Sequence, residues 1–353
     1  MKSVLIKDKW LDSPVIQGGM GIGVSLGNLA GHVAANGGMG VISGANPGYR
    51  QPDFAKNRRE ANRRALIAEI RKAKELSNGR GMVAVNIMVA LNDGEDLARV
   101  AAQQGADAVI GGAGLPLSLP SLVEGTKTAI APIVSSAKAA SLICRSWKKH
   151  YGVLPDFLVV EGSEAGGHLG FSSDELSNHL ACPLDQIVLE VMETIIPFEA
   201  EKGGSIPVFA AGGIYSSEDI RHMLSLGTSG VQIATRFIAT HECDASPEYK
   251  QAYINAKKED IVIVKSPVGM PGRALRSPLI ERLELGQSQP VKSCGNCLRP
   301  CDPAKTPYCI TGALTAAARG DWENGLFFCG SNAYKLDEIL SVKELMAQLT
   351  EKV

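Results

Sequence analysis

The sequence predicts an α/β fold: a closed TIM (βα)8 barrel with a C-terminal cysteine-containing insertion or cap. Between residue 14 and about residue 237, eight short apolar runs alternate with longer stretches of helical periodicity. The chain has 45% hydrophobic but only 5% aromatic residues, a composition that suits parallel strands buried on both faces. No antiparallel hairpin pattern interrupts the alternation, which favours the barrel over a doubly wound open sheet.

The eight apolar runs are the expected strands, and most of them end in glycine or polar residues. They are residues 14–20, 40–44, 83–88, 107–114, 128–136, 156–162, 207–214 and 230–237. Crossover helices are expected between them, of which the periodicity marks residues 26–36, 61–76, 95–104, 137–150, 183–202 and 217–226. Because such barrels keep their chemistry at the carboxyl ends of the strands, we expect the site in these glycine-rich loops.

The rhythm breaks after the eighth run. We expect the barrel to occupy residues 1–237, an insertion or cap residues 238–335, and a C-terminal helix that packs on the barrel residues 336–353. The insertion contains a charged helix-like stretch, an extended segment and a cysteine cluster, and the final amphipathic helix is predicted to begin at Lys335. No low-complexity linker separates these parts.

Charge and hydropathy restrict the partners. The formal net charge of −1 provides no field that attracts nucleic acid or an anionic membrane, so we expect a small-molecule substrate. The first 14 residues contain an apolar run of only three residues, too short for a signal peptide or a membrane span. We therefore expect a cytoplasmic protein. A homodimer is possible, but the sequence does not determine the oligomeric state.

The loop after the seventh expected strand, FAAGGIYSSEDI, has the features of a phosphate-binding turn. Gly212 and Gly213 leave backbone N–H groups free to face an anion, and Ser216 or Ser217 can cap the following helix. The next strand ends in Gln232, Ala234 and Thr235, so two adjacent loops can hold one phosphate. Phosphate sites at strands seven and eight are frequent in such barrels. The alternative is that these glycines only form turns.

The segment VVEGSEAGGHLG places Glu161 at the end of the sixth strand and His168 after two glycines. Gly166 and Gly167 allow the backbone to approach a planar ligand closely. His168 is the candidate acid or base, since it alone among six histidines lies in a glycine-rich loop at a strand end. The other five are expected to be surface or packing residues.

Two further loops complete the expected site. In QGGMGIG, the spacing is wrong for a dinucleotide-binding fingerprint, and Gly18, Gly19 and Met20 instead expose backbone groups to the edge of a heteroaromatic ring. Asn86 lies in the buried run VNIM, where its amide needs a partner. We expect that partner to be the ligand.

The cysteine cluster SCGNCLRPCDPAKTPYCI leaves its role open. Cys294, Cys297, Cys301 and Cys309 have two, three and seven intervening residues, which four thiolates around Zn²⁺ or an iron–sulfur cluster could use. The spacing lacks a second Cys-x-x-Cys pair, so a loop of reduced cysteines without metal is the alternative. The other cysteines are expected to be ordinary thiols: Cys144, Cys182, Cys243 and Cys329.

These motifs, with PIVSS and PGRALRSP and in this order, resemble the nitronate monooxygenase (2-nitropropane dioxygenase) family over about residues 14–276. That family also includes FMN-dependent enoyl-acyl-carrier-protein reductases. The resemblance implies non-covalently bound FMN and matches His168 to the catalytic histidine. Ala234 stands where many relatives have glycine. The implied FMN-site residues are Gly18, Gly19, Met20, Asn86, Glu161, Gly166, Gly167, Ala211, Gly212, Gly213, Gln232, Ala234 and Thr235.

The implied reaction is oxidation of an alkyl nitronate or nitroalkane by O2 to a carbonyl compound and nitrite. His168 would abstract the α-proton of a neutral nitroalkane or, as a cation, hold the anionic nitronate. The main alternative is an NAD(P)H-dependent flavin reductase of enoyl thioesters. A non-catalytic flavin or metal sensor is the third hypothesis.

Overall fold

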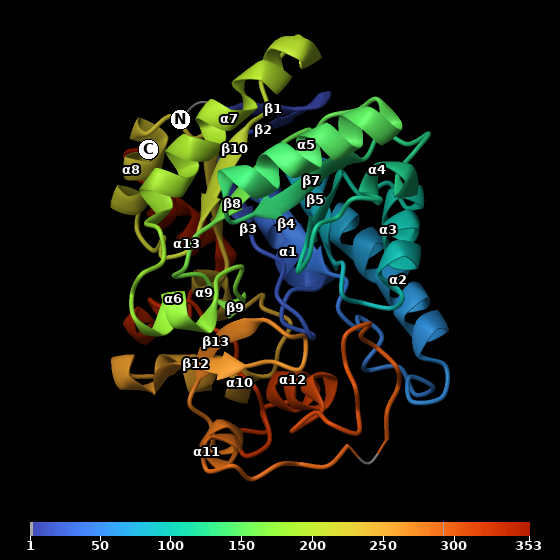
Figure 1. Ribbon diagram of the computed structural model, residues 1–353, viewed down its shortest axis with the longest axis vertical. Helices are drawn as coiled ribbons and strands as arrows, with labels where there is room; N and C mark the ends of the chain where they lie inside the picture. Colours follow the sequence, from blue (N-terminus) through green and yellow to red (C-terminus); the bar gives the residue numbers. More distant parts are fainter. Residues whose placement is uncertain (1–2, 292) are drawn as a thin grey trace.

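The computed structural model describes residues 3–291 and 293–353, and its central feature is a closed barrel of eight parallel strands (Figure 1). Neighbouring strands follow the chain order, and the last strand, β11, closes the barrel by pairing with the first, β3. The predicted barrel is confirmed, and each expected strand run contains one barrel strand or overlaps it. The strands are β3 (Val15–Gln17), β4 (Met39–Ser43), β5 (Met82–Met88), β6 (Ala108–Gly112), β7 (Ala129–Val134), β8 (Leu158–Glu161), β10 (Val208–Ala211) and β11 (Gly230–Ile233).

Alternate residues of the barrel strands face two different cores. Ile16, Val41 and Phe209 point into the barrel, where the Phe209 ring meets Phe157 edge-on at 5.7 Å. Their chain neighbours point outward to the helices. A short hairpin of β1 (Val4–Ile6) and β2 (Lys9–Leu11) packs its apolar side chains against the interior core. Successive side chains of a strand point to opposite faces, and both faces are buried here. This explains why the strands contain few polar residues.

All six helices that the periodicity marked are present. They are α1 (Gly27–Ala35), α2 (Arg58–Ser77), α3 (Gly94–Gln103), α5 (Ala137–Tyr151), α7 (Leu184–Lys202) and α8 (Ser217–Ser225). Every crossover contains a helix, and the shortest is the four-residue α4 (Leu119–Leu122) between β6 and β7. The eighth strand is shorter than predicted, since it ends at Ile233 and α9 (Thr235–Ile238) follows at once.

The last helix, α13 (Val342–Leu349), packs against α1, α8 and α9. It thus takes the place of the eighth barrel helix, although about a hundred residues separate it from β11. It begins seven residues later than predicted. Ser341 explains the start: its hydroxyl accepts from the Glu344 N–H while the Glu344 carboxylate accepts from the Ser341 N–H, a reciprocal cap.

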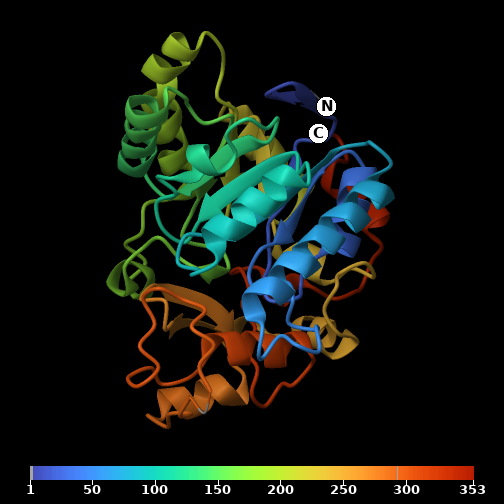
Figure 2. The same ribbon diagram turned by 90° about the vertical axis from the view of Figure 1, so that its right-hand side faces the viewer.

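The segment between α9 and α13 lies across the carboxyl ends of the barrel strands (Figures 1 and 2). It contains α10 (Pro247–Ile254), β12 (Ile261–Lys265), β13 (Pro271–Leu275), α11 (Pro278–Glu284) and α12 (Ile310–Ala318). β13 pairs antiparallel with β12 and with β9 (Gly167–His168), a sheet that the sequence did not indicate. The division of the chain into barrel, insertion and C-terminal helix as separate units stays a prediction.

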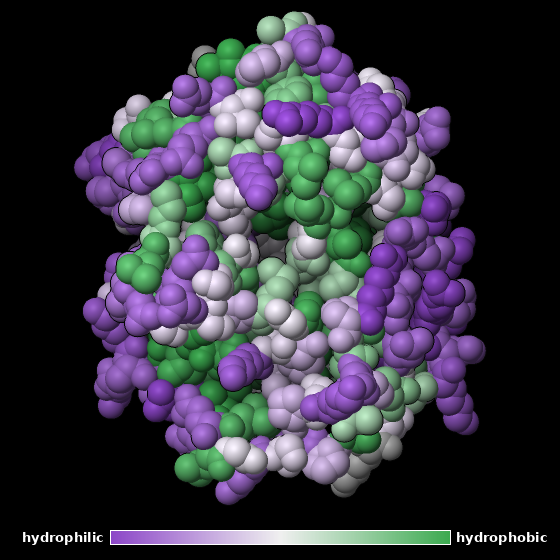
Figure 3. All heavy atoms as spheres, in the orientation of Figure 1, coloured by the Kyte–Doolittle hydropathy of each residue, from purple (hydrophilic) through white to green (hydrophobic). Residues whose placement is uncertain are grey.

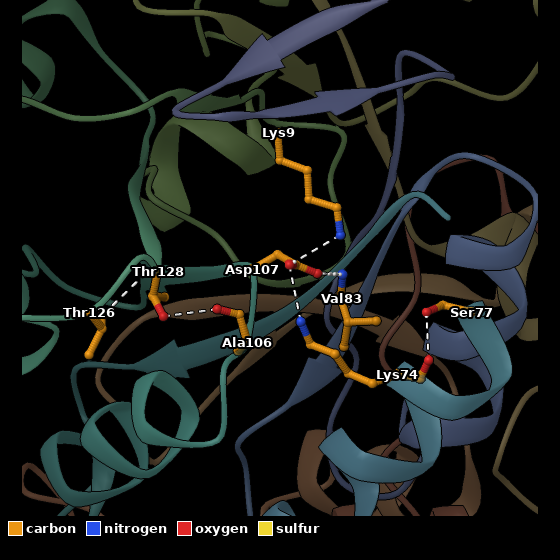
Figure 4. A network of polar contacts seen from close by, with 8 residues as sticks. All are labelled: Lys9, Lys74, Ser77, Val83, Ala106, Asp107, Thr126 and Thr128. Carbon is orange, nitrogen blue, oxygen red and sulfur yellow. Dashed lines mark hydrogen bonds and ion pairs between the residues drawn. The ribbon is translucent and has the colours of Figure 1, made fainter. Parts of the chain in front are cut away.

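The opposite end of the barrel is held by charge pairs (Figure 4). One oxygen of Asp107 lies 3.2 Å from Lys9 Nζ and 3.1 Å from Lys74 Nζ. Its other oxygen accepts from the Val83 N–H at 2.7 Å. One carboxylate therefore joins the β1–β2 hairpin, α2, β5 and β6. No helix within residues 3–291 and 293–353 is long and apolar enough to cross a membrane.

Candidate active site

A cavity of about 240 Å³ lies at the carboxyl ends of the strands, between the barrel and the insertion. Figure 3, in the orientation of Figure 1, shows a hollow near the middle of the molecule. Every residue predicted for the site borders this one cavity, although the roles assigned to them stay predictions. These residues are Gly18, Gly19, Met20, Asn86, Glu161, Gly166, Gly167, His168, Ala211, Gly212, Gly213, Gln232, Ala234 and Thr235.

One end of the cavity is formed by the turn after β10. Gly212 and Gly213 have φ values of +99° and +78°, a conformation that L side chains rarely adopt. In the described part of the chain, the N–H groups of Gly213 and Ile214 donate to no protein acceptor. Ser216, and not Ser217, caps α8 by accepting from the Asp219 N–H. Free N–H groups beside a helix N-terminus are suited to an anion such as a phosphate.

The loop after β3 contributes glycines to the cavity wall, and β5 contributes the amide of Asn86. A Cβ on Gly19 would lie 2.5 Å from the Asn86 Cβ, and a Cβ on Gly18 would lie 3.3 Å from the Gln232 Cγ. Glycine is therefore required at position 19, whereas a Cβ at position 18 would need only a small shift of the Gln232 side chain. The Asn86 amide makes one long hydrogen bond, 3.4 Å to the Ile110 carbonyl. It keeps capacity for a ligand, as the sequence indicated.

His168 reaches the cavity from β9, and the insertion fixes its ring. Its Nε2 lies 2.7 Å from Ser266 Oγ, and the Phe328 ring meets it edge-on at 5.0 Å. Burial lowers the pKa of His168 to about 4, because the imidazolium ion would lose its hydration. The ring is neutral at pH 7, which favours the expected role as a base over the expected role as a cation.

Glu161 also faces the cavity from the end of β8. Burial raises the pKa of this carboxyl group to about 8. No hydrogen-bond partner holds its side chain among the described residues. At pH 7 it is therefore chiefly a carboxylic acid, able to donate a hydrogen bond, and neither Glu161 nor His168 adds charge to the cavity.

The insertion contributes cavity residues that sequence reasoning missed. The Gly330 N–H donates to Thr235 Oγ1 at 2.9 Å, and Asn332 Nδ2 donates to the Gly213 carbonyl at 2.6 Å. Cys329, expected to be an ordinary thiol, also borders the cavity. The available signal was CGSN, a glycine followed by small polar residues. Its place in the fold could not be read from the sequence, because about a hundred residues separate it from Thr235.

The outer part of the cavity has an aliphatic wall. It comes from the loop after β5 and from the insertion, and it consists of Met88, Leu91, Val268, Leu298, Ile310 and Leu314. Most of this wall belongs to the insertion, which was predicted only as a cap and whose inner side borders the cavity. It provides apolar surface for a hydrocarbon portion of a substrate.

The four clustered cysteines lie beside this wall. Asn296 N–H donates to Cys294 Sγ at 3.3 Å, and Gly312 N–H donates to Cys309 Sγ at 3.4 Å. Among the described residues, no group of three or more His, Cys, Asp or Glu side chains is placed to hold a metal ion. All eight cysteines are free thiols. Both predictions for the cluster, a metal site and a metal-free loop, stay predictions.

Comparison with known proteins places these features in a family. The family model described as nitronate monooxygenase matches residues 2–352. Over 276 residues the chain is 26% identical to an octahydro-indene-carboxyl-CoA dehydrogenase of Mycobacterium tuberculosis, which covers 78% of the chain and 66% of that protein. A probable nitronate monooxygenase of Bacillus subtilis is 28% identical over 204 residues, covering 56% of the chain and 51% of the relative. The chain thus spans between half and two thirds of these relatives.

Solved structures agree with the fold. FabK from Thermotoga maritima has a TM-score of 0.73 and 26% identity, covering 97% of this chain and 93% of that one. A nitroalkane oxidase from Streptomyces ansochromogenes has a TM-score of 0.70, covers 96% of both chains and is 21% identical. At that identity the second likeness supports the barrel alone.

Proposed function

The chain belongs to the nitronate monooxygenase family, and on that premise we propose that it is an FMN-dependent enzyme that oxidises alkyl nitronates or nitroalkanes. The products would be a carbonyl compound and nitrite, with O2 as the second substrate. The observation that carries the proposal is one cavity that joins a glycine turn, a neutral histidine and an aliphatic wall.

The residues around the cavity fit a flavin mononucleotide. The free N–H groups of Gly213 and Ile214 would hold its phosphate, as in other anion-binding turns. Gly18, Gly19 and Asn86 would border its ring system. The two glycines have no side chain that would occupy this space, and Asn86 contributes one amide. When bound, the flavin would supply the redox chemistry, taking electrons from the substrate and passing them to O2.

His168 would provide the proton transfer. In the tautomer that donates Nε2–H to Ser266 Oγ, the Nδ1 atom would carry the lone pair that receives the α-proton of a neutral nitroalkane. Burial keeps this ring unprotonated at neutral pH, so the base is ready before substrate enters. A nitronate already lacks that proton and needs no base.

Glu161 would favour the anionic form of the substrate. As a carboxylic acid it donates a hydrogen bond to an oxygen without adding negative charge beside a nitronate. Ionised, it would repel the same substrate.

A second candidate function is NAD(P)H-dependent reduction of an enoyl thioester by the same flavin. Two observations favour it. The outer cavity wall is aliphatic, which suits an acyl chain. The relative from Mycobacterium tuberculosis carries a carboxyl-CoA group in its name.

The deciding experiment uses one preparation and two assays. The purified protein is mixed with ethylnitronate in air, while O2 uptake and nitrite are followed. A second sample receives NADPH and crotonyl thioester without O2. Nitrite released in proportion to enzyme supports the first proposal. Rapid NADPH-dependent reduction of the thioester without nitrite in the first assay would reject it. Bound flavin with no turnover in either assay would instead support the sensor hypothesis.

A further inference from the structure

Asn46 has an unpartnered side-chain donor at the cavity. It lies in the loop between β4 and α2, is only 3% exposed, and borders the cavity beside Ala45. In the described part of the chain its Nδ2 makes no hydrogen bond, whereas its Oδ1 has a partner. Buried amide groups are normally hydrogen-bonded, so a donor without a protein partner at a cavity wall is available to a ligand oxygen.

The direction of the Asn46 amide is set by Asn62, a wholly buried residue of α2. The Gly48 N–H can donate only to an oxygen, so its 3.1 Å bond identifies the Asn62 Oδ1. Asn62 Nδ2 then faces two acceptors, Asp93 Oδ2 at 2.8 Å and Asn46 Oδ1 at 3.4 Å. With its oxygen turned to Asn62, the Asn46 amide presents its NH2 group elsewhere, toward the cavity.

The backbone at this position supports the same arrangement. Asn46 has a φ of +48°, in the left-handed region that asparagine tolerates better than most residues. Its carbonyl accepts from the Tyr49 N–H at 3.2 Å, which closes a tight turn. The loop therefore holds the side chain in one place, and Asp93, itself buried, fixes the far end of the network.

We propose that Asn46 is a ligand-binding residue, whose Nδ2 donates a hydrogen bond to an oxygen atom of the molecule in the cavity. Asn62 and Asp93 are its positioning residues. The oxygen belongs either to a nitronate or carboxylate-like substrate or to a carbonyl of the flavin ring, two sources with the same acceptor chemistry. The inference rests on the proposed function to the extent that it places both molecules in this cavity.

The test replaces Asn46 in two ways that respect its backbone. Asn46→Gly removes the donor and accepts a positive φ without strain. Asn46→Asp keeps the shape but presents an acceptor. FMN affinity of the apoprotein is measured by quenching of flavin fluorescence. Affinity of the holoenzyme for propanoate, which resembles the nitronate of nitroethane, is measured by the change in flavin absorbance.

We expect Asn46→Gly to lower the affinity for one of the two ligands by about tenfold, as loss of one hydrogen bond implies. Asn46→Asp should lower the affinity for the same ligand further. A fall in propanoate affinity alone assigns the bond to the substrate, and a fall in FMN affinity assigns it to the flavin. Unchanged affinity for both ligands in both variants overturns the proposal. Failure of the wild-type protein to bind FMN would instead count against the proposed function.

A control and a positioning variant complete the design. Asn57→Gly alters an exposed asparagine of the same loop that does not border the cavity, so both affinities should stay at the wild-type value. Asp93→Asn removes the charge that orients Asn62 while keeping the shape. We expect it to lower, by about threefold, the affinity for the same ligand that Asn46→Gly affects, with little change in kcat, because it acts only through the direction of the Asn46 amide.

Discussion

At the scale of single residues, the candidate site contains two half-buried groups that desolvation holds neutral in opposite ways. Burial lowers the pKa of His168 to about 4 and raises that of Glu161 to about 8. Desolvation is the first cause in both, since it disfavours whichever form carries charge. The same surroundings therefore keep a base unprotonated and an acid protonated in one cavity at pH 7.

Replacing His168 with alanine separates the two substrates. We expect turnover of neutral nitroethane to fall by about 100-fold or more, the contribution usual for a positioned base. Turnover of ethylnitronate should change little, because no proton needs removal. O2 uptake with each substrate measures both effects, and bound FMN per chain serves as the control. Equal losses on the two substrates would remove proton abstraction from the role of this residue.

The raised pKa of Glu161 predicts that its contribution to the free energy of unfolding depends on pH. Because its folded pKa of about 8 exceeds the unfolded value near 4.5, its stabilising effect is complete below pH 4.5 and is lost as the pH rises through 8. Glu161→Gln should abolish this dependence, so the difference in unfolding free energy between variant and wild type should grow by about 4 kcal/mol between pH 4.5 and pH 9. Urea unfolding across this range measures it. A constant difference would show that the carboxyl is not desolvated.

At the scale of elements, the insertion holds the loop that carries His168. Arg273 of β13 donates to the Ser163 carbonyl at 2.7 Å and also to the Ala165 carbonyl. In the strand pairing, Arg273 itself lies opposite Gly167, and Gly272 lies opposite His168. The barrel provides the strand end, and the insertion determines how the chain leaves it.

Replacing Arg273 with methionine should free this loop. We expect a loss of about 2 kcal/mol of unfolding free energy, since charge-assisted bonds to buried carbonyls are broken. Hydrogen exchange should rise in residues 163–169 and stay unchanged in β3. Arg276→Met is the matched control, because within residues 3–291 and 293–353 the Arg276 side chain pairs only with an exposed Glu284 at 3.6 Å. Exchange that rises equally in both variants would reject the specific role of Arg273.

At the scale of the whole molecule, the Asp107 ion-pair network and the candidate site lie at opposite ends of the barrel. The Asp107 network ties four elements together at the end remote from the cavity (Figure 4). The glycine loops and the insertion occupy the other end (Figure 1). A change at the first end should therefore affect unfolding and leave ligand binding intact.

Asp107→Asn tests this separation. The asparagine oxygen can still accept from Val83, but both lysine pairs are lost, and we expect unfolding to become easier by about 1–2 kcal/mol. FMN affinity should not change. High salt should shrink the difference, because the lysines are partly exposed. Asp302→Asn, at an exposed pair with Lys305, should have almost no effect on stability. Loss of flavin binding in Asp107→Asn would show that the two ends are coupled.

Much of the site was predictable because local chemistry marks it. Gly19, Gly212, Gly213 and His168 each follow a strand, and the barrel fold brings the carboxyl ends of all strands together. Helix starts were less predictable. The final helix begins at Val342 because Ser341 caps it, whereas hydropathy alone placed the start at Lys335.

By itself, the sequence predicted the barrel and, through its motifs and their resemblance to a known family, the fourteen residues that border the cavity, because strand periodicity and glycine turns are local properties. Only the tertiary structure decided what surrounds them. Ser266 and Arg273 hold His168 and the loop before it, and Asn332 borders the cavity, all from a segment whose position no local pattern encodes. Asn46 was missed for the same reason, since its meaning depends on Asn62 and Asp93. The desolvation that sets the charge of His168 and Glu161 comes from residues throughout the fold. It arises only when the insertion covers the barrel.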